Sequence, residues 1–257
     1  MRYKIVTTKN IVSLSSGFQE SHKREVGIPR MGLIYAPTGF GKTTAAAWLV
    51  NRENGVYVRA VSLWSPSTML MAILAELSIS PPRYPAQMLQ GIVDQLKLSQ
   101  RPFFIDEADY LFQNSRMIDT VRDIHDLTGL PVWLIGSQKL EKQLARRKII
   151  AGRISQWVNF LPCDLEDTQK IAQELCLIEV QTDLLEQLHK AAKGSIRLIT
   201  VGLSRIEAFA RIHKWDSINA TQWSGLPFFF TRQVDYQDGF CCKDFKVTNE
   251  LVSFALL

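Results

Sequence analysis

The segment Ala36-Pro37-Thr38-Gly39-Phe40-Gly41-Lys42-Thr43 decides how this chain of 257 residues folds. It follows an apolar run over 32–36, which predicts a short buried strand, and it precedes a helical pattern over 43–52. A glycine-rich loop in that setting is typical of a phosphate-binding loop. Gly39 and Gly41 let backbone N–H groups turn toward phosphate oxygens, and the helix N-terminus adds the positive end of its dipole.

Each part of this loop has an expected role in binding ATP and Mg²⁺. Lys42 reaches the β- and γ-phosphates, the Thr43 hydroxyl ligates Mg²⁺, and the backbone from Ala36 through Thr44 surrounds the phosphates. The usual pattern begins with Gly where this chain has Ala36, so we expect an altered loop geometry rather than loss of binding. The alternative is a chance Gly-Lys-Thr sequence, which the strand–loop–helix setting disfavours.

Apolar runs and helical patterns alternate along the chain after this loop. This alternation predicts an α/β fold with a five-stranded parallel sheet, helices on both faces, and ligands beyond the carboxyl ends of the strands. The other strands are predicted at 56–61, 102–106, 131–136 and 156–161, and the helices between them at 66–77, 85–98, 117–127 and 138–148. Only helical patterns follow, at 165–177, 182–192 and 195–213, and they predict a small helical lid.

The chain is therefore expected to have four parts. They are a basic N-terminal segment (1–30), a nucleotide-binding α/β domain (31–162), the helical lid (163–214) and a C-terminal tail (215–257). The tail is aromatic, with Phe228-Phe229-Phe230, and we expect it either to pack on the body or to dock a partner.

Composition excludes several classes of protein. Hydrophobic residues make up 46% of the chain and charged residues 21%, which is ordinary for a globular protein. No apolar run approaches the ~20 residues of a membrane span, and no apolar signal core follows the first residues, so we expect no membrane association and a cytoplasmic location. The cysteines lack a C-x-x-C pair and a histidine cluster, so free thiols are expected at Cys163, Cys176, Cys241 and Cys242.

Carboxylates end the strand predicted at 102–106. Asp106 is expected to hold Mg²⁺ through its water shell, and Glu107 to polarise the attacking water as a general base. An isolated Asp-Glu pair is weak evidence, but its position downstream of a phosphate-binding loop makes it strong. Asp109 is expected to cap the segment that follows.

Two further polar residues are candidate sensors of the γ-phosphate. Ser137, with Gln138 in reserve, follows the strand 131–136, so its hydroxyl can bond the attacking water or the γ-phosphate. The alternative for Ser137 is a simple helix N-cap. Arg197 begins the last lid helix and can reach the phosphates, and its alternative is an ordinary surface arginine.

Arginines precede the last predicted strand. In ATPases that assemble side by side, an arginine from this region enters the neighbouring site and stabilises the transferred phosphoryl group. The candidates are Arg146, Arg147 and Arg153, which the sequence does not separate, and we favour Arg153 because it lies closest to the strand. Basic blocks over 1–30, 139–153 and 189–214 can attract polyanions, although charge alone favours plain solvated helix faces.

Together these motifs resemble the AAA+ ATPases over residues 30–213. Lys42-Thr43, Asp106-Glu107, Ser137, Arg153 and Arg197 match in order the Walker A, Walker B, sensor 1, arginine finger and sensor 2 of that family. The segments 104–111 and 132–140 are also similar to the transposition regulators MuB, TnsC and TniB, in which an IDEAD-like Walker B and an IGT/IGS-x-x-L sensor segment recur.

The narrower resemblance implies a homo-oligomer, as a ring or helical filament, that forms on duplex DNA when ATP is bound. Such proteins recruit a transposase to the target, and ATP hydrolysis releases them. The resemblance places Arg83 and Tyr84 in the region that faces DNA, and Lys139, Lys142 and Arg146 are further candidates for sequence-nonspecific phosphate contacts. Each of these is individually more typical of a plain surface residue. Unlike MuB, only residues 1–30 precede the first strand, so recruitment through a separate N-terminal module is not expected.

Two alternatives share most of these motifs. One is a helicase loader or replication initiator, including the DnaC- and IstB-like ATPases. The other is a nucleotide-switched regulator with a protein partner, which the Phe-rich tail suggests.

Overall fold

The computed structural model describes residues 1–25 and 27–229. Its larger lobe is built on a five-stranded parallel sheet with the strand order β2-β3-β4-β1-β5. The predicted five-stranded parallel sheet is confirmed. The strands are β1 (Met31–Tyr35), β2 (Val56–Arg59), β3 (Phe103–Asp106), β4 (Val132–Gly136) and β5 (Ile154–Asn159).

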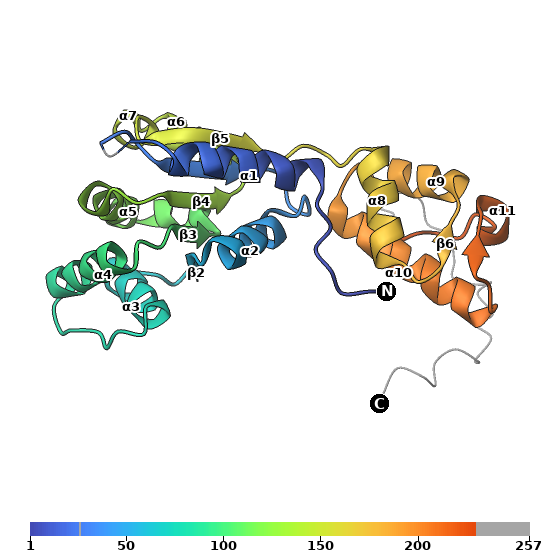
Figure 1. Cartoon of the computed structure of the whole chain (residues 1–257), viewed down its shortest axis with the longest axis horizontal. Helices are drawn as coiled ribbons and strands as arrows, with labels where there is room; N and C mark the ends of the chain where they lie inside the picture. Colours follow the sequence, from blue (N-terminus) through green and yellow to red (C-terminus); the bar gives the residue numbers. More distant parts are fainter. Residues whose placement is uncertain (26, 230–257) are drawn as a thin grey trace, which may run out of the picture.

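Helices cover both faces of the sheet (Figure 1). Because neighbouring residues of a strand point to opposite faces, Phe103 packs in one core and Phe104 in the other. This double burial explains why the strands read as continuous apolar runs. One face carries α1 (Lys9–His22) and α2 (Lys42–Glu53), and the other carries α3 (Pro66–Glu76), α4 (Pro85–Ser99), η1 (Ala108–Gln113), α5 (Ser115–Thr128) and α6 (Gln138–Ala145), with the short α7 (Lys148–Ala151) before β5.

Helix α1 lies in the segment for which the sequence predicted only basic character. Its buried residues Ile11, Leu14 and Phe18 pack against β1, β3, β4 and β5. Gly17 faces β5 closely, and a Cβ on it would come within 3.2 Å of Val158 Cγ2. The helix therefore completes the core of the sheet lobe.

The smaller lobe is the helical lid, which lies beyond the carboxyl end of the sheet (Figure 1). The described part of the expected tail, residues 215–229, packs on it: β7 pairs with β6, and Trp223 is buried in the lid core. The lobe consists of α8 (Leu165–Leu175), β6 (Glu179–Val180), α9 (Thr182–Ala192), α10 (Ile196–Ile212), β7 (Ser217–Ile218) and α11 (Ala220–Trp223). Cys163 and Cys176 are buried free thiols, whereas Phe230, Cys241 and Cys242 lie outside the described residues.

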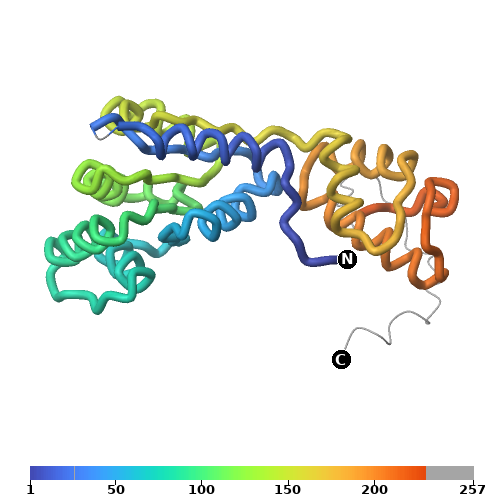
Figure 2. Tube along the Cα trace, in the orientation of Figure 1, coloured from blue at the N-terminus to red at the C-terminus, as the bar shows by residue number. Residues whose placement is uncertain are grey.

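The first residues of the chain form a strap (residues 1–8) that runs from the lid to α1 (Figure 2). The backbone N–H of Arg2 donates to the Leu175 carbonyl at 2.7 Å, and Lys170 Nζ donates to the Thr7 carbonyl at 2.6 Å. At the start of α1, the Asn10 side chain donates to the Leu161 carbonyl at 2.8 Å and accepts from the Leu161 N–H at 3.0 Å. Strap and helix together hold the lid against the sheet lobe.

Within the described residues, none of the helices combines the length and apolar character needed to span a membrane.

Candidate nucleotide site

Two glycines of the phosphate-binding loop have backbone conformations that disfavour other residues. Gly39 has φ +90° and Gly41 has φ +83°. A Cβ on Gly39 would lie 2.8 Å from Ser195 Oγ, and one on Gly41 would lie 3.0 Å from Ile196 Cδ1. The two glycines thus allow the loop to turn its backbone inward while the lid lies directly against it.

Ala36 fits this loop without strain. It is fully buried in the core under α1 and α2, and it does not have a positive φ. The position therefore accepts a methyl group, and the departure from the Gly of the usual pattern has a structural explanation. Lys42 Nζ donates to the carbonyls of Ala36 and Pro37, each at 2.9 Å. Burial lowers the pKa of Lys42, while the nearby carboxylates of Glu107 and Asp106 oppose that shift.

The carboxylates at the end of β3 have two partners from β2. Asp106 is buried, and its Oδ2 accepts a hydrogen bond from the Tyr57 hydroxyl at 2.9 Å. Glu107 has φ +51°, an uncommon conformation for a residue with a side chain, and its carboxylate lies 3.3 Å from Arg59 Nη2. Burial and the charge of Asp106 raise the pKa of Tyr57. Neither pair was predictable from the sequence, because both depend on the register that sets Arg59 beside Asp106.

Ser137 is held by a residue to which the sequence assigned a different role. Asp109 accepts hydrogen bonds from both the backbone N–H and the hydroxyl of Ser137. The expectation that Asp109 caps the segment after it is wrong: η1 has no side-chain cap. Ser137 Oγ also accepts from the Lys139 N–H at 3.1 Å, so this residue both caps α6 and lies at the strand end. Gln138 is exposed at the start of α6.

The lid docks on the phosphate-binding loop through the start of α10. The Arg197 N–H donates to the Gly39 carbonyl at 3.1 Å, and Ser195 Oγ donates to the same carbonyl at 3.3 Å. These contacts enclose a cavity of about 390 Å³ at the carboxyl ends of the strands. The predicted residues that line it are Thr38, Gly39, Gly41, Lys42, Thr43, Thr44, Asp106, Glu107, Ser137 and Arg197.

The donor set in this cavity fits a nucleotide with Mg²⁺. Thr43 offers a hydroxyl ligand, and Asp106 offers a carboxylate that can hold Mg²⁺ through a water ligand. Mg²⁺ usually takes its other ligands from phosphates and water. Among the described residues, no group of three or more His, Cys, Asp or Glu could bind a metal by itself. The cavity thus lacks an all-protein metal cage, and its glycine-lined loop leaves room for phosphates.

A second cavity of about 400 Å³ adjoins the loop on the side of the strap. It shares Gly41 and Thr44 with the first cavity, and its wall is largely apolar, with Ile11, Phe160 and Ile196. Its size and apolar wall suit an aromatic base, and its position suits a base whose phosphates lie in the loop. The sequence did not predict this cavity because its wall combines the strap, α1, the phosphate-binding loop, α2, Phe160 after β5 and the lid. Thr8, a residue type that often begins helices, was the sequence signal that could have predicted α1, which forms one wall of the cavity.

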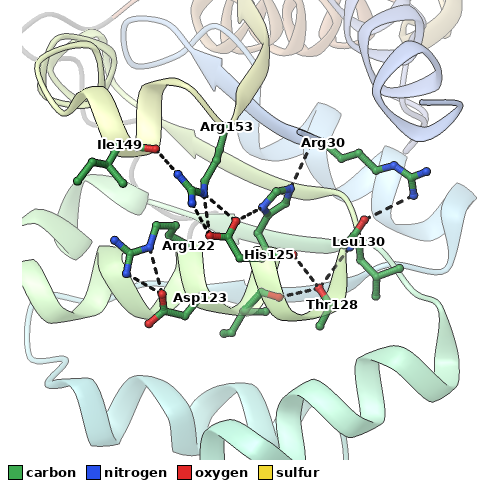
Figure 3. Close-up of polar contacts among 11 residues, drawn as sticks. Arg30, Arg122, Asp123, His125, Thr128, Leu130, Ile149 and Arg153 are labelled. Atoms are coloured by element: carbon green, nitrogen blue, oxygen red, sulfur yellow. Dashed lines mark hydrogen bonds and ion pairs between the residues drawn. The ribbon is translucent and has the colours of Figure 1, made fainter. Parts of the chain in front are cut away.

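Arg153, which we favoured as the arginine acting on a neighbouring subunit, is engaged within its own subunit. Its guanidinium contacts both oxygens of Asp126 on α5, with Nη2 at 2.6 Å from Oδ2 (Figure 3). Arg153 holds the pKa of Asp126 below its usual value, and the same carboxylate bonds His125 Nδ1 at 2.9 Å. His125 Nε2 in turn accepts the Arg30 N–H at 3.2 Å. This network ties the start of β5 to α5 and to the start of β1.

The other two candidate arginines differ in their surroundings. Arg147 lies over the Phe112 ring at 5.1 Å, which is a cation–π contact. Arg146 is exposed at the end of α6, and in the described part of the chain its side chain has no hydrogen bond or ion pair. All three lie near the start of β5, at the end of the sheet away from the phosphate-binding loop (Figure 1).

The candidate DNA contacts lie on two separate parts of the sheet lobe. Arg83 and Tyr84 are exposed between α3 and α4, near the β2 edge, and the Arg83 guanidinium lies over the Tyr84 ring at 5.7 Å. Lys139, Lys142 and Arg146 are exposed along α6, which packs on β1 and β4. The residues of each group therefore lie near one another, but the two groups lie on separate parts of the sheet lobe.

The parallel sheet, the glycine-rich loop, the acidic strand end and the lid define an AAA+ P-loop fold. Residues 28–144 match the family model described as an AAA domain. No curated protein sequence matches the chain significantly.

Solved structures of archaeal proteins have the same fold. One is the ORC2 protein of Aeropyrum pernix in ADPNP and ADP complexes, which is 17% identical over 86% of this chain and 68% of that chain, with a TM-score of 0.68. Another is Cdc6p of Pyrobaculum aerophilum, which is 16% identical over 82% of this chain and 63% of that chain, with a TM-score of 0.63. A third is the ORC1 protein of A. pernix in complex with DNA, which is 16% identical over 84% of this chain and 63% of that chain, with a TM-score of 0.62. This chain thus spans about two thirds of the length of each.

Proposed function

We propose that this chain is an ATPase that binds duplex DNA as a homo-oligomer when ATP is bound and leaves it after hydrolysis. The observation that carries the proposal is the convergence of the glycine-rich loop, Asp106-Glu107 and Ser137 on one cavity that the lid closes with Arg197. Binding, water activation and phosphate sensing each need a different group, and this cavity contains candidates for all of them.

The residues of the chain divide the reaction between them. Lys42 exchanges its carbonyl partners for the β- and γ-phosphates, and backbone N–H groups of the loop hold the phosphate oxygens. Glu107 accepts a proton from the attacking water. Ser137, whose backbone N–H stays bonded to Asp109, turns its hydroxyl hydrogen from Asp109 to that water or to the γ-phosphate. Thr43 and Asp106 would hold Mg²⁺, which would neutralise phosphate charge.

An arginine from a neighbouring subunit completes the site in this proposal. Arg146, Arg147 and Arg153 remain the candidates, and Arg153 acts in trans only after its guanidinium leaves Asp126. Arg146 has no such contact to break.

The finer proposal is delivery of a DNA target to a transposase. It is supported by the IDEAD-like segment 104–111 and the IGS segment 135–137. A second candidate is a replication-initiator or helicase-loader role, which the likeness to the A. pernix ORC1 protein in complex with DNA favours. Co-purification of a transposase or of a replicative helicase with the ATP-bound protein separates these roles.

Glu107→Gln tests the shared proposal. The variant should bind ATP but hydrolyse it about 10²- to 10⁴-fold more slowly, because the general base is lost while the phosphate contacts remain. It should also retain duplex DNA on filters after ATP is added, whereas the wild type releases it. Glu76→Gln, at an exposed position on α3, is the matched control and should behave as wild type. Unchanged turnover in Glu107→Gln would remove this residue from its role, and retention of DNA without any nucleotide dependence would refute the switch.

A further inference from the structure

The Asp106 carboxylate is held by two hydrogen bonds that come from different parts of the chain. Its Oδ1 accepts from the Glu107 N–H at 2.8 Å, and its Oδ2 accepts from the Tyr57 hydroxyl at 2.9 Å. Glu107 is the next residue of the chain, whereas Tyr57 lies on β2. The outer torsion of an aspartate side chain is broad, so its rotamer alone does not fix the plane of the carboxylate. One hydrogen bond on each oxygen does fix that plane.

The register of β2 and β3 brings the Tyr57 hydroxyl to this carboxylate. Tyr57 pairs with Phe104, and Asp106 follows two residues later on the same face of β3. The tyrosine side chain therefore reaches toward the carboxyl end of β3, and it packs against the core beneath α1 and α2. Because this packing holds the ring, the hydroxyl donates to Asp106 from a fixed position.

This arrangement leaves Asp106 able to act on a metal. A carboxylate accepts up to about four hydrogen bonds, and the described residues supply two to Asp106, one on each oxygen. Asp106 lines the nucleotide cavity together with Thr43, so its remaining lone pairs can accept from a water ligand of Mg²⁺. The tyrosine hydroxyl is uncharged, so it orients the carboxylate without neutralising it. A guanidinium in its place, such as the one that Arg59 presents to Glu107, would repel the metal.

We propose that Tyr57 is a positioning residue for Mg²⁺, because its hydroxyl holds the Asp106 carboxylate in the orientation that accepts from a water ligand of the metal. This role rests on the proposed function, since it assumes that Thr43 and Asp106 hold Mg²⁺ beside a nucleotide in the cavity. It gives β2 a part in metal binding, although none of the residues of this strand lines the cavity. Groups that orient the ligands of a metal change its affinity when they are replaced.

The test measures how much Mg²⁺ strengthens nucleotide binding by the full chain. Calorimetry gives the affinity for the β,γ-imido analogue of ATP, which resists hydrolysis, in excess Mg²⁺ and in EDTA, and the ratio of the two affinities is the metal effect. Tyr57→Phe keeps the ring and removes only the hydroxyl. It should therefore reduce the metal effect about 3- to 10-fold, as expected for one lost hydrogen bond, and leave the affinity in EDTA unchanged.

Tyr35→Phe is the matched control and should leave the metal effect unchanged. Tyr35 is also half-buried on a strand of the sheet, but it packs against the core on the other face. Within the described part of the chain, its hydroxyl makes no hydrogen bond.

A double-mutant cycle shows whether Tyr57 acts through Asp106. Asp106→Asn should reduce the metal effect by itself, and adding Tyr57→Phe to this variant should change it by less than about twofold. Full multiplication of the two separate effects would mean that Tyr57 acts independently of Asp106, and it would overturn the positioning role.

The remaining outcomes separate the role of Tyr57 from the proposed function. Equal weakening of analogue binding in Mg²⁺ and in EDTA by Tyr57→Phe would show a structural role and overturn metal positioning, as would an unchanged metal effect. A wild-type chain that binds the analogue equally well in Mg²⁺ and in EDTA would also overturn it, while leaving nucleotide binding intact. A wild-type chain that does not bind the analogue under either condition would instead overturn the proposed function itself.

Discussion

Replacing Arg59 by Ala should accelerate ATP hydrolysis. Arg59 Nη2 lies 3.3 Å from Glu107 Oε1, so the carboxylate that we assign as general base is paired with a guanidinium in the structure. This pair directs one of the carboxylate oxygens toward the guanidinium and away from the attacking water. Glu107 therefore has to leave Arg59 before it can accept a proton from the attacking water.

The exposure of this pair limits the size of the effect. The side chains of Arg59 and Glu107 are 61% and 42% exposed, and exposed pairs contribute at most about 1 kcal/mol. A free-energy difference of that size corresponds to about a fivefold change in the fraction of unpaired Glu107. Arg59→Ala should therefore raise kcat by up to about fivefold.

The assay is steady-state phosphate release at saturating ATP and without DNA, at two salt concentrations. Salt screens exposed pairs, so the difference between variant and wild type should shrink as the salt concentration rises. Arg52→Ala is the matched control, because Arg52 is similarly exposed and lies 3.5 Å from Glu53 but is remote from the cavity. A kcat that falls more than about tenfold in a folded Arg59→Ala protein would mean that Arg59 assists the reaction, and an unchanged kcat would mean that the pair does not restrain Glu107.

Two further predictions concern hydrogen bonds seen in the structure. Asp109→Ala removes both acceptors of Ser137, so kcat should fall about 10- to 100-fold while calorimetry shows little change in ATP affinity; a change confined to affinity would contradict the orienting role. Asn10→Ala removes two hydrogen bonds to Leu161 and should lower the free energy of unfolding in urea by about 2 kcal/mol, whereas the exposed Asn159→Ala should change it by less than about 0.5 kcal/mol. Equal effects of these two substitutions would show that Asn10 does not fasten the segment after β5 to α1.

The sequence predicted most of the sheet lobe because local signals determine it. The apolar runs predicted the strands to within a few residues, since both faces of the sheet are covered and the central strands β1, β3 and β4 are almost wholly buried. The glycines of the loop 36–43 predicted a phosphate-binding turn between β1 and α2, because Gly39 and Gly41 are needed where the backbone has positive φ. These features depend on residues that are close in the chain.

Features that depend on strand register or on distant segments escaped prediction. The pairing of Arg59 with Glu107 requires β2 to lie beside β3 in one register, which no local pattern encodes. Helix α1 has only a short apolar stripe among polar and basic residues, so its sequence alone does not predict burial. It is buried because it packs on the apolar face of the sheet. The cavity beside the strap exists only where the strap, α2 and the lid meet.

The position of α1 determines which parts of the chain can fold alone. The stretch that matches the AAA domain family, residues 28–144, contains neither α1 nor β5. A protein cut to that stretch would expose the face of the sheet that holds Ile34, Phe104 and Trp133, and it would leave β1 as an open edge that other chains can pair with. Such a fragment should aggregate, even though it contains every loop residue that contacts phosphate. The smallest soluble unit of this protein therefore begins before α1 and extends past β5.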